Sequence, residues 1–306
     1  MKLLQKIEQH ILKTQHKDIL NFLLYLKLEK RYSSHTIKNY EQDLYHFTQF
    51  IKIEAINWSH FTINECTNFL YHLENKKYAK KTIHRHISSL RSFWAYLISK
   101  NKCIRNPWKF VKASKYQRQL PYILSSNEIK KILDMLPTQK ANEIRNKCIC
   151  ELLYSTGMRV SELTNIRMNK INWNEHEIVI TGKGNKQRIV LFGKTAKLWL
   201  QTYINHARPK TTSSNNYLFL NRFKTQLTER SVQRLFNSIS SSQNLTKPIT
   251  PHTLRHCFAT DLYEGGADIR TIQQLLGHKN INSTNLYTHL STKHLKKIID
   301  HHHPRA

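Results

Sequence analysis

The sequence predicts a mainly α-helical protein with a small β-sheet, in which an N-terminal four-helix domain precedes a C-terminal α+β catalytic domain. Three observations support this fold class. Apolar residues recur at intervals of three and four through the first hundred residues, two β-branched runs flank a glycine-containing turn near residue 184, and helical periodicity then returns. A length of 306 residues is sufficient for two domains, each with its own core.

Four helices are predicted in the N-terminal part. One begins at Ser33 or Ser34 and carries an apolar stripe formed by Ile37, Tyr40, Leu44, Phe47 and Ile51. A second stripe consists of Ile83, Ile87, Leu90, Trp94 and Leu97. Residues 18–30 and 62–76 predict the other two helices, and Thr62 and Glu65 have capping-box spacing. We therefore expect a helical domain over residues 1–108.

A basic segment without acidic residues, 109–121, follows this domain and is predicted to be a linker that can run along a phosphate backbone. Ser125 and Glu128 form a second capping-box pattern, so a new domain is expected over residues 122–306. Within it, the runs EIVIT (177–181) and QRIVLF (187–192) flank GKGNK and predict a β-hairpin.

The charge balance indicates a polyanionic partner. Lys and Arg total 49 against 20 Asp and Glu, a formal net charge of +29, which favours nucleic acid as the partner. The sequence contains no run of 18 apolar residues and no N-terminal signal pattern, so we expect a cytoplasmic protein. The five cysteines form no CxxC pair and the histidines lack zinc spacing, so reduced thiols and no metal site are expected.

Four short motifs in the second domain contain candidate catalytic residues, and each is weak alone. Arg159 follows a glycine turn with Glu162 three positions on, a pair that by itself predicts a surface ion pair. Lys183 lies between two glycines in the hairpin turn, where an isolated lysine usually has no function. His252 and Arg255 lie one turn apart near a helix N-terminus that Thr250 is expected to cap, a position that favours anions.

The fourth motif contains His278 and Tyr287, and an isolated helical tyrosine is usually a half-buried core residue. The whole set suits one reaction, the attack of a hydroxyl on a phosphodiester. Guanidinium groups match the non-bridging oxygens of the phosphate, a tyrosine can form a phosphate ester, and a lysine or histidine can protonate the leaving oxygen. The ester retains the bond energy, so no ATP is required, and the guanidinium groups are expected to take the place of a metal ion.

These motifs resemble the tyrosine recombinases of the phage integrase family. The resemblance rests on TGMRVSEL, TGKGNKQRIVLF, HTLRHCFAT, LLGHKN and STNLYTHL, in that order, and on SSHTIKNYEQDLYHF near the N-terminus. The ending HPRA is similar to bacterial Xer-type members. The resemblance implies that Tyr287 attacks the scissile phosphate to give a 3′-phosphotyrosyl intermediate. Its further implied assignments are Arg159 and Arg255 on the phosphate, His278 assisting them, Lys183 as general acid, His252 handling the proton of the nucleophile, and Glu162 orienting its neighbours.

The resemblance also implies an assembly without a cofactor. The two domains would clamp double-stranded DNA, four protomers (or two paralogous pairs) would form a tetramer, and a C-terminal helix over residues 291–303 would dock on a neighbouring protomer. The alternative for that helix is packing on the domain of its own chain. Xer-type function would be chromosome dimer resolution during cell division, with a septal DNA translocase as a further partner. The alternatives are an integrase of a phage or mobile element, a type IB topoisomerase and a non-catalytic DNA-binding protein.

Overall fold

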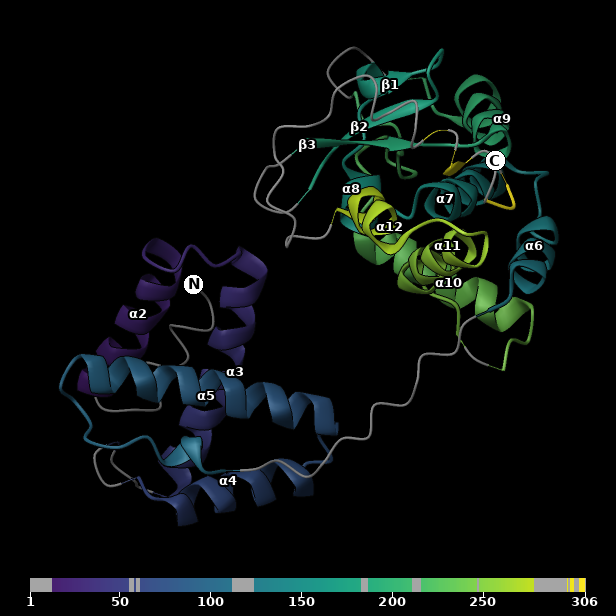
Figure 1. Cartoon of the computed structure of the whole chain (residues 1–306). Coiled ribbons are helices and arrows are strands. Elements are labelled where there is room, and N and C mark those ends of the chain that lie inside the picture. The colour runs from purple at the N-terminus through teal and green to yellow at the C-terminus, as the bar shows by residue number, and fades with distance from the viewer. Residues whose placement is uncertain are drawn as a thin grey trace. The chain divides into compact units, whose positions relative to one another are not determined.

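The computed structural model describes residues 13–54, 58, 61–111, 124–182, 187–210, 216–246, 248–277, 296, 298, 299 and 303–305. The chain divides into two compact units, Met1–Leu120 and Pro121–Ala306, whose elements are labelled in Figure 1. The described part is mainly helical with one three-stranded sheet, as the sequence predicts.

The four helices predicted in the N-terminal unit are all present: α2 (Lys13–Leu28), α3 (Ser34–Glu54), α4 (Ile63–Asn75) and α5 (Lys80–Ser99). Two of their starts follow the expected local chemistry. The hydroxyl of Ser33 accepts a hydrogen bond from the backbone N–H of Thr36 at 3.3 Å, and Thr62 and Glu65 form the predicted capping box. The helix α5 packs against the other three (Figure 1).

Aromatic side chains fill the core of the N-terminal unit. Phe47, Phe69 and Trp94 are fully or almost fully buried there, together with Trp108 in the short helix η2 (Pro107–Lys109). Val111, inside the segment expected to be linker, is also buried in this core. The guanidinium of Arg91 stabilises this extension by donating hydrogen bonds to the backbone carbonyls of Trp108 and Val111. The packed N-terminal unit therefore extends at least to Val111.

The second unit contains seven α-helices among its described residues. They are α6 (Ser126–Asp134), α7 (Ala141–Thr156), α8 (Val160–Thr164), α9 (Lys194–Thr202), α10 (Glu229–Ser242), α11 (Pro251–Glu264) and α12 (Ile269–Leu276). Two single turns, η3 (Met168–Lys170) and η4 (Tyr203–Ala207), complete the helical part. The predicted capping box of Ser125 and Glu128 begins α6.

The predicted β-hairpin is present. Its strands β2 (Glu177–Thr181) and β3 (Gln187–Leu191) are antiparallel, and Thr181 pairs with Gln187 directly beside the turn. A two-residue strand, β1 (Ile171–Asn172), pairs with the other edge of β2. The hairpin turn therefore consists of residues 182–186, of which the structure describes only Gly182.

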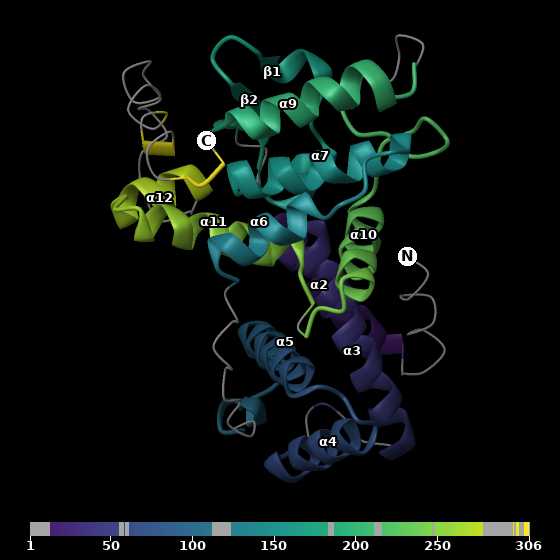
Figure 2. The same ribbon diagram turned by 90° about the vertical axis from the view of Figure 1, so that its right-hand side faces the viewer.

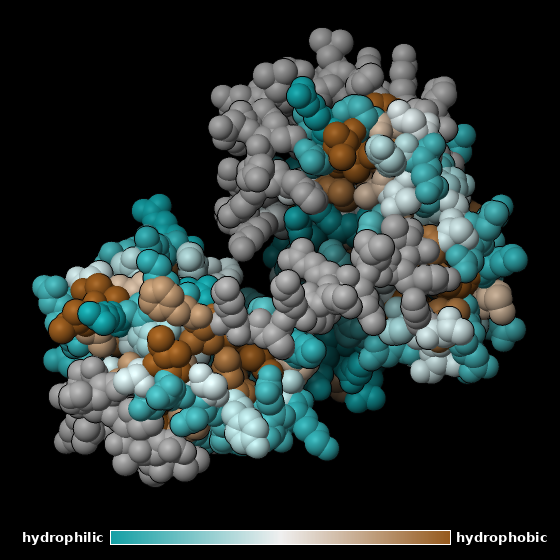
Figure 3. Space-filling model, turned by 60° about the horizontal axis from the view of Figure 1, so that its bottom comes forward, coloured by the Kyte–Doolittle hydropathy of each residue, from teal (hydrophilic) through white to brown (hydrophobic). Residues whose placement is uncertain are grey.

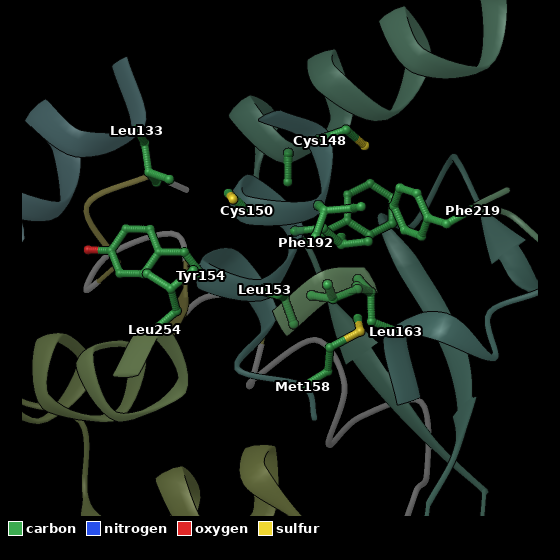
Figure 4. Packing of buried hydrophobic residues seen from close by; sticks show 14 of the residues in the cluster. Leu133, Cys148, Cys150, Leu153, Tyr154, Met158, Leu163, Phe192, Phe219 and Leu254 are labelled. Atoms are coloured by element: carbon green, nitrogen blue, oxygen red, sulfur yellow. The ribbon is translucent and has the colours of Figure 1, made fainter. Parts of the chain in front are cut away.

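The helix α7 is the centre of the second unit. Every side chain from Lys147 to Thr156 is buried, because α9 and α11 pack on different sides of the helix (Figure 2). Figure 4 shows part of this core, in which side chains from several elements meet: Leu133, Cys148, Cys150, Leu153, Tyr154, Met158, Leu163, Phe192, Phe219 and Leu254. Such a core fixes the ends of α7 and α11, where the candidate residues lie.

The C-terminal residues pack on the second unit of the same chain. The guanidinium of Arg305 lies 2.6 Å from Glu151 Oε1 and 2.5 Å from Asp134 Oδ1. Ile299 is buried in a cluster with Phe258. These contacts agree with packing on the chain's own domain for the described residues of 291–303, and docking on a neighbouring protomer stays a prediction.

On the face of the N-terminal unit that Figure 3 shows, hydrophobic patches lie exposed between hydrophilic side chains. Leu24, Leu28 and Phe110 are among the large apolar residues that remain exposed. No helix in the described part of the chain is long and apolar enough to span a bilayer. The five cysteines are free thiols, and burial raises the pKa of Cys66, Cys148, Cys150 and Cys257.

Candidate active site

Arg159 is positioned by the junction between α7 and α8. Gly157 ends α7 in the left-handed conformation (φ 58°), and its N–H donates to the carbonyl of Leu153. Arg159 is the N-cap residue of α8. The motif TGMRVSEL therefore comprises the end of α7, a three-residue connection (157–159) and the start of α8, which places Glu162 one turn beyond Arg159.

The carboxylate of Glu162 is a hydrogen-bond acceptor for two arginines. It accepts from the backbone N–H of Arg159 at 2.7 Å and from Arg159 Nη1 at 3.0 Å. Arg188 donates to it from Nη1 at 2.6 Å and from Nη2 at 3.2 Å. The side chain of Glu162 is only 2% exposed, so the pair expected on the surface is half buried.

The electrostatics keep Glu162 ionised. Burial acts to raise the pKa of its carboxyl, but the hydrogen bonds and charge of Arg188, together with Arg159, outweigh burial and hold the pKa below its usual range. A buried carboxylate that accepts four hydrogen bonds has little remaining acceptor capacity. The position of the Arg159 side chain is therefore set by a group that is itself rigidly held.

Arg188 was missed by sequence reasoning, which treated QRIVLF only as a strand. The side chain of Arg188 is buried and projects from β3 on the same face as Val190. The available signal was that this arginine alternates with apolar residues on the face of the strand that points into the core. A charge buried there requires a partner of opposite charge. The sequence does not reveal that Glu162, 26 positions away, is that partner.

Arg255 lies on α11 and joins two other helix ends. Its Nη1 donates to the carbonyl of Gly157 at 2.5 Å, and its Nη2 donates to the carbonyl of Leu276 at 2.6 Å. Burial, and then the charges of Arg159 and Arg188, lower the pKa of Arg255 to about 10. The three guanidiniums share one region, because Arg159 and Arg188 both donate to Glu162 and Arg255 donates to the carbonyl of Gly157, two residues before Arg159.

His252 lies in the first turn of α11. The predicted N-terminus of this helix is confirmed, because Thr250 accepts a hydrogen bond from the N–H of Thr253 at 3.0 Å and Pro251 occupies the first turn. The side chain of His252 is exposed, one turn before Arg255. Its imidazole is thus accessible to a ligand at this helix end.

The other three predicted residues, Lys183, His278 and Tyr287, lie outside the described residues. The structure describes their neighbours in two cases. Gly182 follows β2 directly before Lys183, and Gly277 ends α12 in the left-handed conformation (φ 66°) directly before His278. A Cβ atom on Gly277 would lie 3.0 Å from Cδ of Arg188, so the segment that leads to His278 begins against the Arg188 side chain.

The described part of the site is suited to holding a phosphodiester. Three guanidiniums and one carboxylate carry an excess of positive charge, and each guanidinium has five N–H donors, of which Glu162 and the two carbonyls occupy only some. The side chain of Arg159 is 42% exposed, so it is open to a ligand. Planar guanidiniums match phosphate oxygens in geometry and charge.

Comparison with known proteins identifies the family of the chain. Residues 123–294 match the phage integrase family, and residues 19–101 match the phage integrase N-terminal SAM-like domain. The tyrosine recombinase XerD of Oceanobacillus iheyensis is 39% identical over 252 residues, covering 81% of this chain and 84% of that relative. The tyrosine recombinase XerC of Anoxybacillus flavithermus is 40% identical over 242 residues, covering 78% and 81%.

Solved structures share the fold. The XerH site-specific recombinase bound to palindromic difH substrate aligns with a TM-score of 0.70 at 22% identity, covering 96% of this chain and 92% of that one. The Tn1549 transposon integrase in complex with circular intermediate DNA also has a TM-score of 0.70, at 18% identity, with 90% and 98% covered. The chain therefore belongs to the phage integrase family and is a tyrosine recombinase, a DNA strand-exchanging enzyme with Xer recombinases among its relatives.

Proposed function

We propose that this enzyme is a site-specific recombinase that cuts and rejoins duplex DNA through a 3′-phosphotyrosyl intermediate. The observation that carries the proposal is that Arg159 is held by buried Glu162 while Arg255 is held by the carbonyl of Gly157, two residues before Arg159. Two fixed guanidiniums can therefore bind one phosphate. As the phosphate is attacked, negative charge develops on its non-bridging oxygens. Preorganised donors stabilise that charge without a cost of reorganisation during the reaction.

The remaining residues complete the reaction. The Tyr287 oxygen forms a bond to the scissile phosphorus while the bond from phosphorus to the 5′ oxygen breaks. His252 takes up the phenolic proton, Lys183 protonates the leaving 5′ oxygen, and His278 donates a hydrogen bond to the phosphate. The 5′ hydroxyl of another strand reverses these steps, so the number of phosphodiester bonds is conserved and the reaction needs neither ATP nor a cofactor.

Membership of the family supports a separate role for each part of the chain. The N-terminal unit, which includes Val111, forms the DNA clamp, the rest of the basic segment 109–121 connects the units, and residues 122–306 carry the catalytic residues. Strand exchange between two duplexes requires four active protomers, so we place the enzyme in a tetramer on DNA, homomeric or with a paralogue. The C-terminal helix is proposed to link neighbouring protomers within that tetramer.

For the cellular role we propose chromosome dimer resolution in the cytoplasm, because XerD and XerC relatives are 39% and 40% identical over most of the chain. A septal DNA translocase is then the partner that activates the tetramer. An integrase of a mobile element would use the same residues at a different DNA site. The two roles differ in the location of the site that the enzyme cuts.

The test is covalent trapping. The purified full chain is incubated with sheared genomic DNA from the cells that carry it, detergent stops the reaction, and DNA bound to protein is recovered and sequenced. We expect wild-type enzyme to trap one chromosomal site with a free 5′ hydroxyl, and Tyr287→Phe to bind DNA without trapping any. Tyr263→Phe is the matched control, because Tyr263 is an exposed tyrosine on α11, and it should trap DNA as the wild type does.

Two outcomes contradict the proposal. If Tyr287→Phe forms the adduct, another residue is the nucleophile. If the trapped DNA carries a free 3′ hydroxyl, the polarity of the ester is wrong. Recovery of the boundaries of a mobile element instead of a fixed chromosomal site favours the integrase role and rejects dimer resolution.

A further inference from the structure

Arg188 connects three segments that lead to the proposed catalytic residues. It lies on β3, the strand that leaves the hairpin turn containing Lys183. Its guanidinium holds the carboxylate of Glu162, which in turn holds Arg159. Its Cδ and Nε atoms lie 3.0 Å from the position that a Cβ on Gly277 would take, and Gly277 immediately precedes His278.

The geometry of the pair with Glu162 is typical of an orienting interaction. The two parallel donations at 2.6 and 3.2 Å form a bidentate contact, which fixes the plane of the carboxylate as well as its location. Glu162 is 2% exposed and Arg188 is 8% exposed, so water does not compete for the contact. The same two carboxylate oxygens also accept from Arg159, whose side chain is 42% exposed.

Stability alone does not account for such a pair. Replacing a buried ion pair with apolar side chains of similar volume is often neutral or stabilising, because the charges no longer have to be desolvated. A fixed carboxylate does, however, restrict an otherwise mobile arginine to one orientation. Misplacement of a catalytic group by about 1 Å costs on the order of 100-fold in rate.

We propose that Arg188 is a positioning residue for DNA cleavage: through Glu162 it holds the guanidinium of Arg159 in the orientation that receives the scissile phosphate. This inference rests on the proposed function, in which Arg159 binds that phosphate. Arg188 itself does not touch the DNA. Its loss therefore slows cleavage and leaves DNA affinity almost unchanged.

The experiment measures single-turnover cleavage and DNA affinity separately. The probe is the site recovered by covalent trapping, made as a nicked duplex from which cleavage releases a short oligonucleotide. The variants are Arg188→Met, which removes the charge and the donors, and Arg188→Lys, which keeps the charge. Arg145→Met is the matched control, because Arg145 is a partly buried arginine of α7 that donates to the carbonyl of Leu220 and takes no part in the site.

Arg188→Met is expected to slow cleavage on the order of 10- to 100-fold while Kd for the probe changes by less than about twofold. Arg188→Lys is expected to recover part of the rate, and Arg145→Met to cleave at the wild-type rate. In an Arg159→Ala background, Arg188→Met should slow cleavage by no more than about twofold further, because residues that act through one another are not additive.

Three results overturn the inference: wild-type cleavage by Arg188→Met, a full additional loss in the Arg159→Ala background, or an equal loss in Arg145→Met. If Arg188→Met does not fold, Arg188→Met combined with Glu162→Gln removes both buried charges, and a wild-type rate in that double variant overturns it equally. A wild-type enzyme that traps no DNA rejects the proposed function itself, and the inference falls with it. If the wild-type enzyme traps DNA and one of the three results above is found, only the inference is rejected and the proposed function stands.

Discussion

Arg255 donates a hydrogen bond from Nη2 to the backbone carbonyl of Leu276 at 2.6 Å, while its Nη1 donates to the carbonyl of Gly157 at 2.5 Å. Both acceptors lie at the C-terminal ends of helices, α12 and α7, where carbonyls have no partner within the helix. A cation at these ends also interacts favourably with the helix dipoles. One guanidinium therefore joins three helices at the proposed phosphate site.

The first prediction concerns Arg255→Lys. An ammonium keeps the charge but cannot reach two separate carbonyls and a phosphate in a fixed plane. We expect the free energy of unfolding to fall by about 1–3 kcal/mol, and cleavage to slow by about 100-fold or more. Urea denaturation and the covalent-adduct assay measure the two effects. Arg234→Lys, at an exposed position on α10, is the control, and a wild-type cleavage rate for Arg255→Lys would contradict the prediction.

The second prediction compares alanine at two glycines. Gly157 and Gly277 are both left-handed, so either substitution strains the backbone by roughly 1–2 kcal/mol. A Cβ on Gly157 would also lie 2.4 Å from the ring of fully buried Phe258. Among the described residues, the atoms nearest to a Cβ on Gly277 belong to the flexible Arg188 side chain, at 3.0 Å. Gly157→Ala should therefore lower the free energy of unfolding by about 1–3 kcal/mol more than Gly277→Ala. Equal or reversed losses in urea denaturation would show that the Phe258 contact relaxes without cost.

The third prediction concerns acid. His303 is buried between the rings of Tyr154 and Phe258, with centroids at 4.8 and 5.4 Å, and burial lowers its pKa to about 4. The unfolded chain takes up this proton near pH 6.5 and the folded chain does not, so folding stability falls as the pH decreases from about 6.5 towards 4. Between pH 7 and pH 5 the loss from this one group is about 1–2 kcal/mol.

The variant His303→Leu removes the titrating group, so the difference in unfolding free energy between pH 7 and pH 5 should be smaller than in the wild type. Urea denaturation of both proteins at both pH values provides the comparison. The same pH dependence in the two proteins would mean that His303 is protonated as easily in the folded chain as in the unfolded chain.

The fourth prediction concerns salt. With a formal net charge of +29, the protein is expected to bind DNA by displacing condensed counterions. The logarithm of the association constant should fall linearly with the logarithm of the salt concentration. The slope should be about −0.9 for each phosphate that the protein neutralises. Titrations in increasing sodium chloride, with a neutral osmolyte as the control, measure the slope. A slope near zero would argue that the excess charge does not face DNA.

Much of the fold was predictable because its signals are local. The capping boxes at Thr62 and Ser125 and the hairpin at residues 177–192 each depend on residues close in sequence, and all are present. The apolar stripe that begins at Ile83 is likewise buried over its whole length. Periodicity did not predict that the N-terminal core includes Val111, because the residues around it form no repeating pattern.

By itself, the sequence determined the helices, the hairpin, the strongly positive charge and the family, because periodicity, spacing and motif order are properties of a linear chain. Only the tertiary structure decided which charged side chains contact one another and which backbone carbonyls they bind. Glu162 pairs with Arg188 across 26 positions, and Arg255 bonds to the carbonyl of Gly157 across 98. These contacts depend on how α7, α8, α11 and β3 pack, and the packing energy of a core is shared among many residues rather than encoded in any short segment.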